Sequence, residues 1–250
     1  MNNELSIDHR KSEIDLENNK SDNTASALKA AVETFIPGIG SILSEVISVV
    51  IPNQKIDRIK LFAQVLDQKV NFIEQEILEV KMKTEEFTDL LEDALRQASR
   101  ALSDERRDYI ASFLKNSLTN EEISHLEEKK LLSILNELND AEIILLKYEA
   151  LDQHEKRDFY EQHSSIVSPE PPSLRGTRVE YDKYYLHKSY KNSLQDLGLV
   201  EPVFKKPRKG EMPEFDGKTG MVKSTYRQAT GLGRLLLRYI DQGVEDGFDE

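Results

Sequence analysis

The sequence of 250 residues contains no cysteine and no tryptophan. Without cysteine it cannot form a disulfide, a thiolate nucleophile, a Cys-ligated zinc site or an iron–sulfur cluster. Its mean hydropathy is −0.57, with 38% hydrophobic and 32% charged residues, which is hydrophilic for a globular chain but short of the disordered range. The length suits one large or two small domains with a real core. We therefore expect a soluble, helix-rich protein.

Signature motifs of common enzyme classes are missing as well. The chain has no GxxxxGK[ST] phosphate loop, no GxSxG nucleophile elbow, no HExxH zinc helix and no GxGxxG after a strand. No two of the five histidines are spaced to meet on one helical turn, which argues against a local metal site. Glu214, Asp216 and Lys218 have the acid-x-acid-x-Lys order of some nucleases, but they lie in a Gly- and Pro-rich stretch. We expect a non-enzymatic protein with no catalytic residue, metal or cofactor.

Charge is distributed unevenly along the chain. The formal net charge is −12, from 34 Lys and Arg against 46 Asp and Glu. Between Pro171 and Ile240 there are 14 basic and 7 acidic residues, so this segment is +7 and the rest of the chain is −19. An acidic surface repels nucleic acid, whereas a basic module attracts phosphate. The sequence thus predicts an acidic helical part, a smaller basic module and a short acidic tail, residues 243–250.

The first 52 residues fall into two segments. Residues 1–24 are polar and predict a disordered arm without a secretory leader. Residues 25–52 are the most apolar stretch of the chain, and Glu45 is the only charge between residues 35 and 51. A transmembrane helix needs roughly 20 predominantly apolar residues. This stretch is shorter and is interrupted by Pro37.

Three interpretations of residues 25–52 stay open. The first is a buried helical hairpin, with Pro37 in the first turn of its second helix. The second is a membrane or partner surface that is exposed on activation, and the third is a membrane span. The candidate surface consists of apolar side chains: Phe35, Ile39, Ile42, Leu43, Val46, Ile47 and Val50.

Amphipathic helices are predicted over the next hundred residues. Apolar residues recur at steps of three and four from Ile56 to Val80, which predicts one long helix. Because the apolar positions never settle into a seven-residue repeat, we expect a multi-helix bundle over residues 25–165 and not a coiled coil.

Capping residues predict where further helices of this bundle begin. Thr84 and Ser103 suit N-cap positions. The segments Thr119–Glu122 and Asn139–Glu142 have the order of a capping box, in which a glutamate three residues on reaches back to the cap residue.

A proline-rich linker, residues 166–177, separates the bundle from the basic module, residues 178–242. In the module we expect a helix over 180–197 that ends at Gly198, strands over 199–204 and 221–229, and a closing helix over 232–240. The Gly- and Pro-rich stretch between the strands, residues 205–220, is termed the wing. This order predicts a winged-helix-like module after the bundle, and the fold class is mainly α.

The predicted helix 180–197 has a polar side and an apolar stripe of Leu186, Tyr190, Leu194 and Leu197. A recognition helix needs a cationic, hydrogen-bonding face to neutralise phosphates and read base edges. The candidate nucleic-acid-binding residues are those of the polar side and of the wing: Lys183, His187, Lys188, Lys191, Asn192, Gln195, Lys205, Lys206, Arg208 and Lys209. In the open alternative, this face packs against the acidic bundle or a partner.

Three local signatures together resemble the Abi-alpha family of bacterial proteins, which is named for abortive infection against phage. The first is Asp104–Leu114, in which charged residues precede a small aliphatic stretch. The second is Leu135–Leu146, in which acidic residues precede aliphatic ones. The third is the pair of segments Asn192–Val200 and Ala229–Leu237. The pair is similar to the family's "NLxxLGLI" and "LTxxGxxF" phrases. The resemblance spans residues 25–240 and implies a phage-defence context, and it carries over no catalytic residue.

These observations lead to three hypotheses of function. The first is a non-enzymatic interaction or effector protein of phage defence, bacterial and cytoplasmic, that binds a protein partner or itself. The alternative is a winged-helix regulator that binds DNA through the helix 180–197. The third is an effector that perturbs membranes through residues 25–52.

Overall fold

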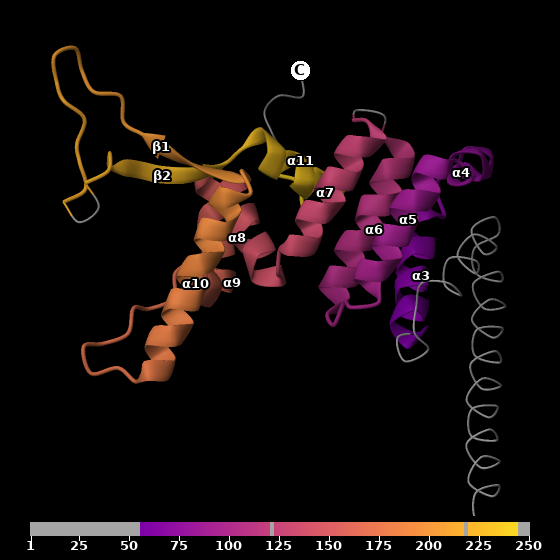
Figure 1. Ribbon diagram of the computed structural model, residues 1–250, viewed down its shortest axis with the longest axis horizontal. Helices are drawn as coiled ribbons and strands as arrows, with labels where there is room; N and C mark the ends of the chain where they lie inside the picture. The colour runs from indigo at the N-terminus through magenta and orange to yellow at the C-terminus, as the bar shows by residue number, and fades with distance from the viewer. Residues whose placement is uncertain (1–55, 121–122, 218–219, 245–250) are drawn as a thin grey trace, which may run out of the picture. The chain divides into compact units, whose positions relative to one another are not determined.

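A computed structural model describes residues 56–120, 123–217 and 220–244. In these residues eight helices precede an antiparallel hairpin, and one helix follows it, so the predicted mainly α fold class is confirmed (Figure 1). The chain divides into two compact units between Leu132 and Ser133. The polar arm, the apolar segment 25–52 and most of the acidic tail lie outside the described residues.

The described part of the first unit is helical. Its elements are α3 (Ile56–Val70), α4 (Gln75–Met82), α5 (Glu85–Ala98), α6 (Asp104–Thr119) and the first half of α7 (His125–Glu137). Helix α6 packs against both α3 and α5, and α4 contacts α5 and α6 (Figure 1). The core of these helices consists of fully buried apolar side chains, among them Phe62, Leu66, Leu90, Leu95, Ile110 and Phe113.

The predicted long helix over 56–80 is interrupted. Helix α3 ends at Val70, and α4 begins at Gln75 after a turn in which Ile73 N–H donates to the Val70 carbonyl at 3.0 Å. On α3 the predicted stripe is buried, but Ile77 and Val80 on α4 are 44% and 66% exposed, while Met82 is buried. The prediction of one continuous helix is therefore wrong, because α4 packs against α5 and α6 by a different face.

Most of the predicted helix caps are confirmed. The Thr84 and Ser103 side chains accept hydrogen bonds from backbone N–H groups of the first turns of α5 and α6. Asn139 and Glu142 form the predicted capping box. The predicted box at Thr119 is wrong, since Thr119 is the last residue of α6 and its hydroxyl donates to the Lys115 carbonyl at 3.2 Å.

The next helix start uses a different residue. Ser124 precedes α7, and its N–H and hydroxyl both donate to the Glu127 carboxylate, at 2.7 and 2.8 Å. These hydrogen bonds from Ser124 hold the pKa of the Glu127 carboxyl below its usual value. Ser124 and Glu127 have the three-residue spacing of a capping box, so the sequence carried this signal as well.

The second unit contains the rest of α7 and all later elements. These are α8 (Asp140–Ala150), α9 (Gln153–Val167), α10 (Arg178–Asp196), β1 (Val200–Phe204), β2 (Ser224–Ala229) and α11 (Gly231–Tyr239). Helix α8 packs against α9, α10, α11 and β2 (Figure 1). The predicted order of helix, strand, wing, strand and helix is present, and the proline-rich stretch lies between α9 and α10.

Helix α10 ends in a Schellman motif that starts the hairpin. Gly198 has a φ of +71°, Gly198 N–H donates to the Gln195 carbonyl, and Leu199 N–H donates to the Leu194 carbonyl. The strands then pair antiparallel, with Val200 opposite Ala229. The predicted C′ role of Gly198 is confirmed.

Helix α11 begins on top of this motif. Thr230 N–H donates to the Leu199 carbonyl at 2.9 Å, and the Thr230 hydroxyl donates to the Gly198 carbonyl at 2.7 Å. Gly233 lies so close to Leu199 that a Cβ at this position would overlap the Leu199 carbonyl oxygen and touch Leu146. A side chain at residue 233 is therefore excluded, whereas Gly231, two residues earlier, has open space around it.

We expect Gly233→Ala to lower the free energy of unfolding by about 1 to 3 kcal/mol, because a new methyl group would be forced into packed backbone. Gly231→Ala in the same helix is the matched control, and it should leave stability unchanged or raise it by up to about 1 kcal/mol. Urea denaturation followed by far-ultraviolet circular dichroism measures both. Equal stabilities of the two variants would contradict the close approach.

Candidate functional site

The polar side of α10 is divided between the interior and the surface. His187 Nε2 hydrogen-bonds to the Ile166 carbonyl, and Lys191 Nζ donates to the Val167 carbonyl at 2.8 Å. Both carbonyls belong to the last turn of α9, where backbone acceptors lack helical partners and a cation is favoured. His187 and Lys191 therefore hold α10 against the end of α9, and they differ from the prediction that they face a phosphate backbone.

The other predicted residues of α10 are open to solvent. Lys183, Lys188, Asn192 and Gln195 are all exposed. Of the predicted apolar stripe, Leu194 is buried, Tyr190 and Leu197 are half-buried, and Leu186 is 57% exposed. The core face of α10 is thus rotated toward His187 and Lys191, because these side chains satisfy the α9 carbonyls.

Lys191 belongs to a partly buried charge cluster, which consists of Glu149 on α8, Lys156 on α9, Lys191 on α10 and Arg227 on β2. Lys156 Nζ lies 4.0 Å from Glu149 Oε2, and an Arg227 guanidinium nitrogen donates to the Lys191 carbonyl at 3.4 Å. Burial raises the pKa of Glu149, and the three cations oppose this rise. Burial also lowers the pKa of Lys191. One carboxylate thus faces cations from three elements that pack around α8.

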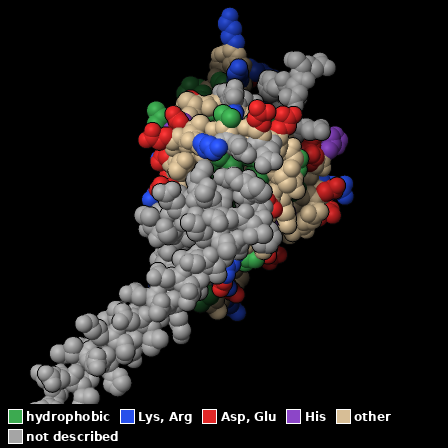
Figure 2. Space-filling model, turned by 90° about the vertical axis from the view of Figure 1, so that its right-hand side faces the viewer, with side chains coloured by type: hydrophobic (Ala, Val, Ile, Leu, Met, Phe, Trp, Pro, Cys, Tyr) green, Lys and Arg blue, Asp and Glu red, His purple; other side chains and the backbone are tan. Residues whose placement is uncertain are grey.

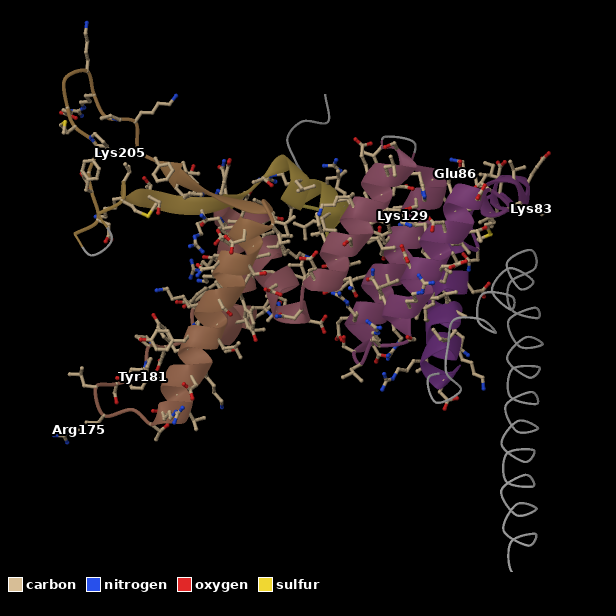
Figure 3. All side chains as sticks on the ribbon, in the orientation of Figure 1. Lys83, Glu86, Lys129, Arg175, Tyr181 and Lys205 are labelled. Carbon is tan, nitrogen blue, oxygen red and sulfur yellow. The ribbon has the colours of Figure 1, made fainter. Side chains whose placement is uncertain are left out.

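The wing carries the most exposed basic run of the described residues. Lys205, Lys206, Arg208 and Lys209 are all exposed and make no ion pair within the described residues (Figure 3 labels Lys205). Beyond this run the wing continues the hairpin, since Phe215 pairs with Val222 across an antiparallel bridge. Several large apolar side chains around the strands are also exposed: Phe204, Met212, Phe215, Met221 and Tyr226.

A depression of about 570 Å³ lies beside the first half of α10. It is lined by the proline-rich stretch and by Lys183, Tyr184 and His187. The stretch is tied to the helix by Tyr181, whose hydroxyl donates to the Ser173 carbonyl at 2.9 Å (Figure 3 labels Tyr181). The predicted polar side of α10 therefore faces the proline-rich stretch at Lys183 and His187.

The first unit has a charged cluster of its own, which sequence reasoning missed. Asp89 Oδ2 on α5 accepts from Lys129 Nζ at 2.7 Å and lies 3.1 Å from His125 Nε2, both on α7. The hydrogen bond from Lys129 is the main reason why the pKa of Asp89 is lowered. Acidic side chains are spread over the described surface that faces the viewer in Figure 2. A 36-residue gap separates Asp89 from His125, so only the fold brings them together.

The remaining predictions concern metals, membranes and residues 25–52. Within the described residues, no group of three or more His, Asp or Glu side chains is arranged to hold a metal ion. No helix among those residues combines the length and the apolar character needed to cross a membrane. The candidate surface from Phe35 to Val50 lies outside the described residues. Comparison with protein-family models, with curated proteins and with solved structures gives no match to this chain.

The charge cluster should make stability depend on pH. Because the pKa of Glu149 is raised above 4.5 in the folded chain, its contribution favours folding below pH 4.5 and is lost as the pH rises through the raised pKa. We expect the unfolding free energy of the unsubstituted protein, relative to Glu149→Gln, to fall as the pH rises above 4.5.

Urea denaturation at a series of pH values measures this difference. Glu161→Gln on α9 is the control, because the Glu161 side chain is 68% exposed and, within the described residues, pairs only with Arg157, one turn away. Parallel pH profiles for the unsubstituted protein and Glu149→Gln would contradict the burial of this carboxyl group.

Proposed function

We propose that this protein is a non-enzymatic interaction or effector protein of a bacterial phage-defence system of the abortive-infection type, and that it acts in the cytoplasm. The resemblance of residues 104–114, 135–146, 192–200 and 229–237 to the Abi-alpha family supports the phage-defence context. The apolar surface of α10 supports binding of a protein partner.

This surface lies on the N-terminal half of α10. Val179 and Leu186 are seven residues apart, which places them on the same side of the helix. They are 61% and 57% exposed, and the neighbouring Tyr185 is 61% exposed. Exposed apolar side chains that gather on one side of a helix are typical of a surface that binds another protein. Asp182 and Lys183, also exposed, lie between them on the same side of the helix, so the surface combines apolar and charged side chains.

We expect cells that carry the gene to survive phage challenge better than cells without it, and Leu186→Asp to weaken this protection. Full burial of a leucine side chain is worth about 1.5 to 3 kcal/mol, so its loss from the contact should weaken binding by about tenfold or more. Gln162→Asp places the same charge at an exposed position of α9, outside this surface, and should keep the protection. Plaque counts over a broad phage panel measure the effect.

Two results would count against this proposal. Unchanged plaque counts with the unsubstituted protein would remove the phage-defence role. Full protection by Leu186→Asp would place the partner surface elsewhere than on α10.

A DNA-binding regulator is the second candidate function, and the basic run of the wing favours it. In winged-helix proteins the hairpin loop follows the helix that enters the major groove, and α10 directly precedes β1 here. With His187 and Lys191 engaged by α9, the available cations are Lys183 and Lys188 on α10 and the four of the wing. This arrangement suits contacts to phosphates more than direct reading of base edges.

Gel-shift titrations with duplex DNA at several salt concentrations test the second candidate. Each phosphate contact contributes about 0.9 to the slope of log K against log salt, so replacing all four wing cations by alanine should reduce the slope by up to about 3.6. The control replaces four exposed cations of the first unit by alanine, namely Lys83, Arg96, Arg100 and Lys130. Absence of binding at low salt would exclude DNA binding.

A further inference from the structure

The outer side of α4 carries apolar side chains that nothing in the described residues covers. Ile77 and Val80 are three residues apart, hence on one side of the helix, and they are 44% and 66% exposed. In the turn before α4, Phe72 is 73% exposed and Ile73 is half-buried. We call these four residues, Phe72, Ile73, Ile77 and Val80, the α4 stripe.

The position of the α4 stripe follows from the interruption at residue 71. Had α3 continued as one helix, Ile73, Ile77 and Val80 would have extended its buried face. Instead Met82 is the side chain of α4 that is buried, and Ile77 and Val80, which continue the apolar pattern of α3, are exposed. An amphipathic pattern of this kind is spaced for packing, so the α4 stripe is a surface without its partner.

A matching apolar segment lies in the same chain, immediately before α3. Residues 35–51 carry one charge, Glu45, and apolar side chains at three- and four-residue steps, including Ile39, Ile42 and Val46. Only residues 52–55 separate this segment from Ile56, the first residue of α3. The sequence therefore supplies an apolar partner that is tied to the unit bearing the α4 stripe.

The tether is long enough to reach. Helix α3 has 15 residues and is about 22 Å long, and four residues separate its far end from α4. The 13 residues from Ile39 to Ile51 span about 20 Å as a helix and about 45 Å when extended. A tethered partner is present at an effective concentration in the millimolar range, which favours a contact within one chain over one between chains.

Charge around the α4 stripe argues against a membrane as the partner. Glu74 and Glu76 are exposed among the residues of the stripe, and Lys81 and Lys83 follow it, so the stripe has no cluster of four or more basic residues. Anionic lipid surfaces attract basic segments and repel such carboxylates. The nearly uncharged segment 35–51 meets no such repulsion.

We propose that residues 35–51 dock on the α4 stripe of the same chain. The contact would bury two apolar surfaces at once. The proposal concerns this chain alone and depends on neither phage defence nor DNA binding.

The cysteine-free sequence makes crosslinking a direct test. Ile77→Cys is combined in turn with Ile39→Cys, Ile42→Cys, Val46→Cys and Val50→Cys in the full chain and treated with a short bismaleimide. The matched control replaces Ile77→Cys by Leu102→Cys, an 80% exposed leucine beyond the far end of α5. We expect at least one Ile77 pair to crosslink within the monomer about tenfold faster than its Leu102 counterpart.

Hydrogen exchange supplies a second readout that does not depend on the choice of pair. Ile77→Asp/Val80→Asp should raise amide exchange in residues 35–51 and leave α5 and α6 unchanged, because both replaced side chains are exposed. Leu102→Asp should change neither. Unaltered exchange in 35–51 would overturn the proposal, as would crosslinks formed only between two chains. A third result would also overturn the proposal: the unsubstituted protein floats with anionic vesicles and Ile77→Asp/Val80→Asp does not. The α4 stripe would then bind a membrane.

Discussion

The second unit depends on the close approach of α11 to the end of α10. The Gly198 and Leu199 carbonyls accept hydrogen bonds from Thr230, and Gly233 has no room for a side chain beside Leu199. This contact fixes where α10 stops, where β1 starts and how α11 meets α8. It also brings Leu146 of α8 and Leu199 beside Gly233 of α11.

Local signals predicted the local structure well. Thr84, Ser103 and Asn139 cap the helices that they were expected to cap, and Gly198 takes the positive φ that its place after α10 requires. These outcomes depend on a few neighbouring residues, and capping and glycine rules describe such neighbourhoods. The order of helix, hairpin and helix followed from the same kind of signal.

Features that depend on distant residues were not predictable in this way. His187 and Lys191 turn inward because two carbonyls at the end of α9 need donors, and the sequence of α10 alone does not show that need. The same holds for Asp89, which meets His125 and Lys129 only after α5 and α7 have packed. The helix and the hairpin that carry the candidate residues were therefore predicted correctly, whereas the contacts of His187 and Lys191 with α9 were not predicted.

Helix α7 adds a constraint on how the chain can be divided. Its buried residues Leu131 and Leu132 belong to the first unit, and Ile134 and Leu135 belong to the second. One continuous helix thus carries buried side chains on both sides of the boundary. A fragment or chimera that contains one unit should therefore keep α7 whole. A break at the boundary would separate the buried Leu131 and Leu132 from the buried Ile134 and Leu135 of the same helix.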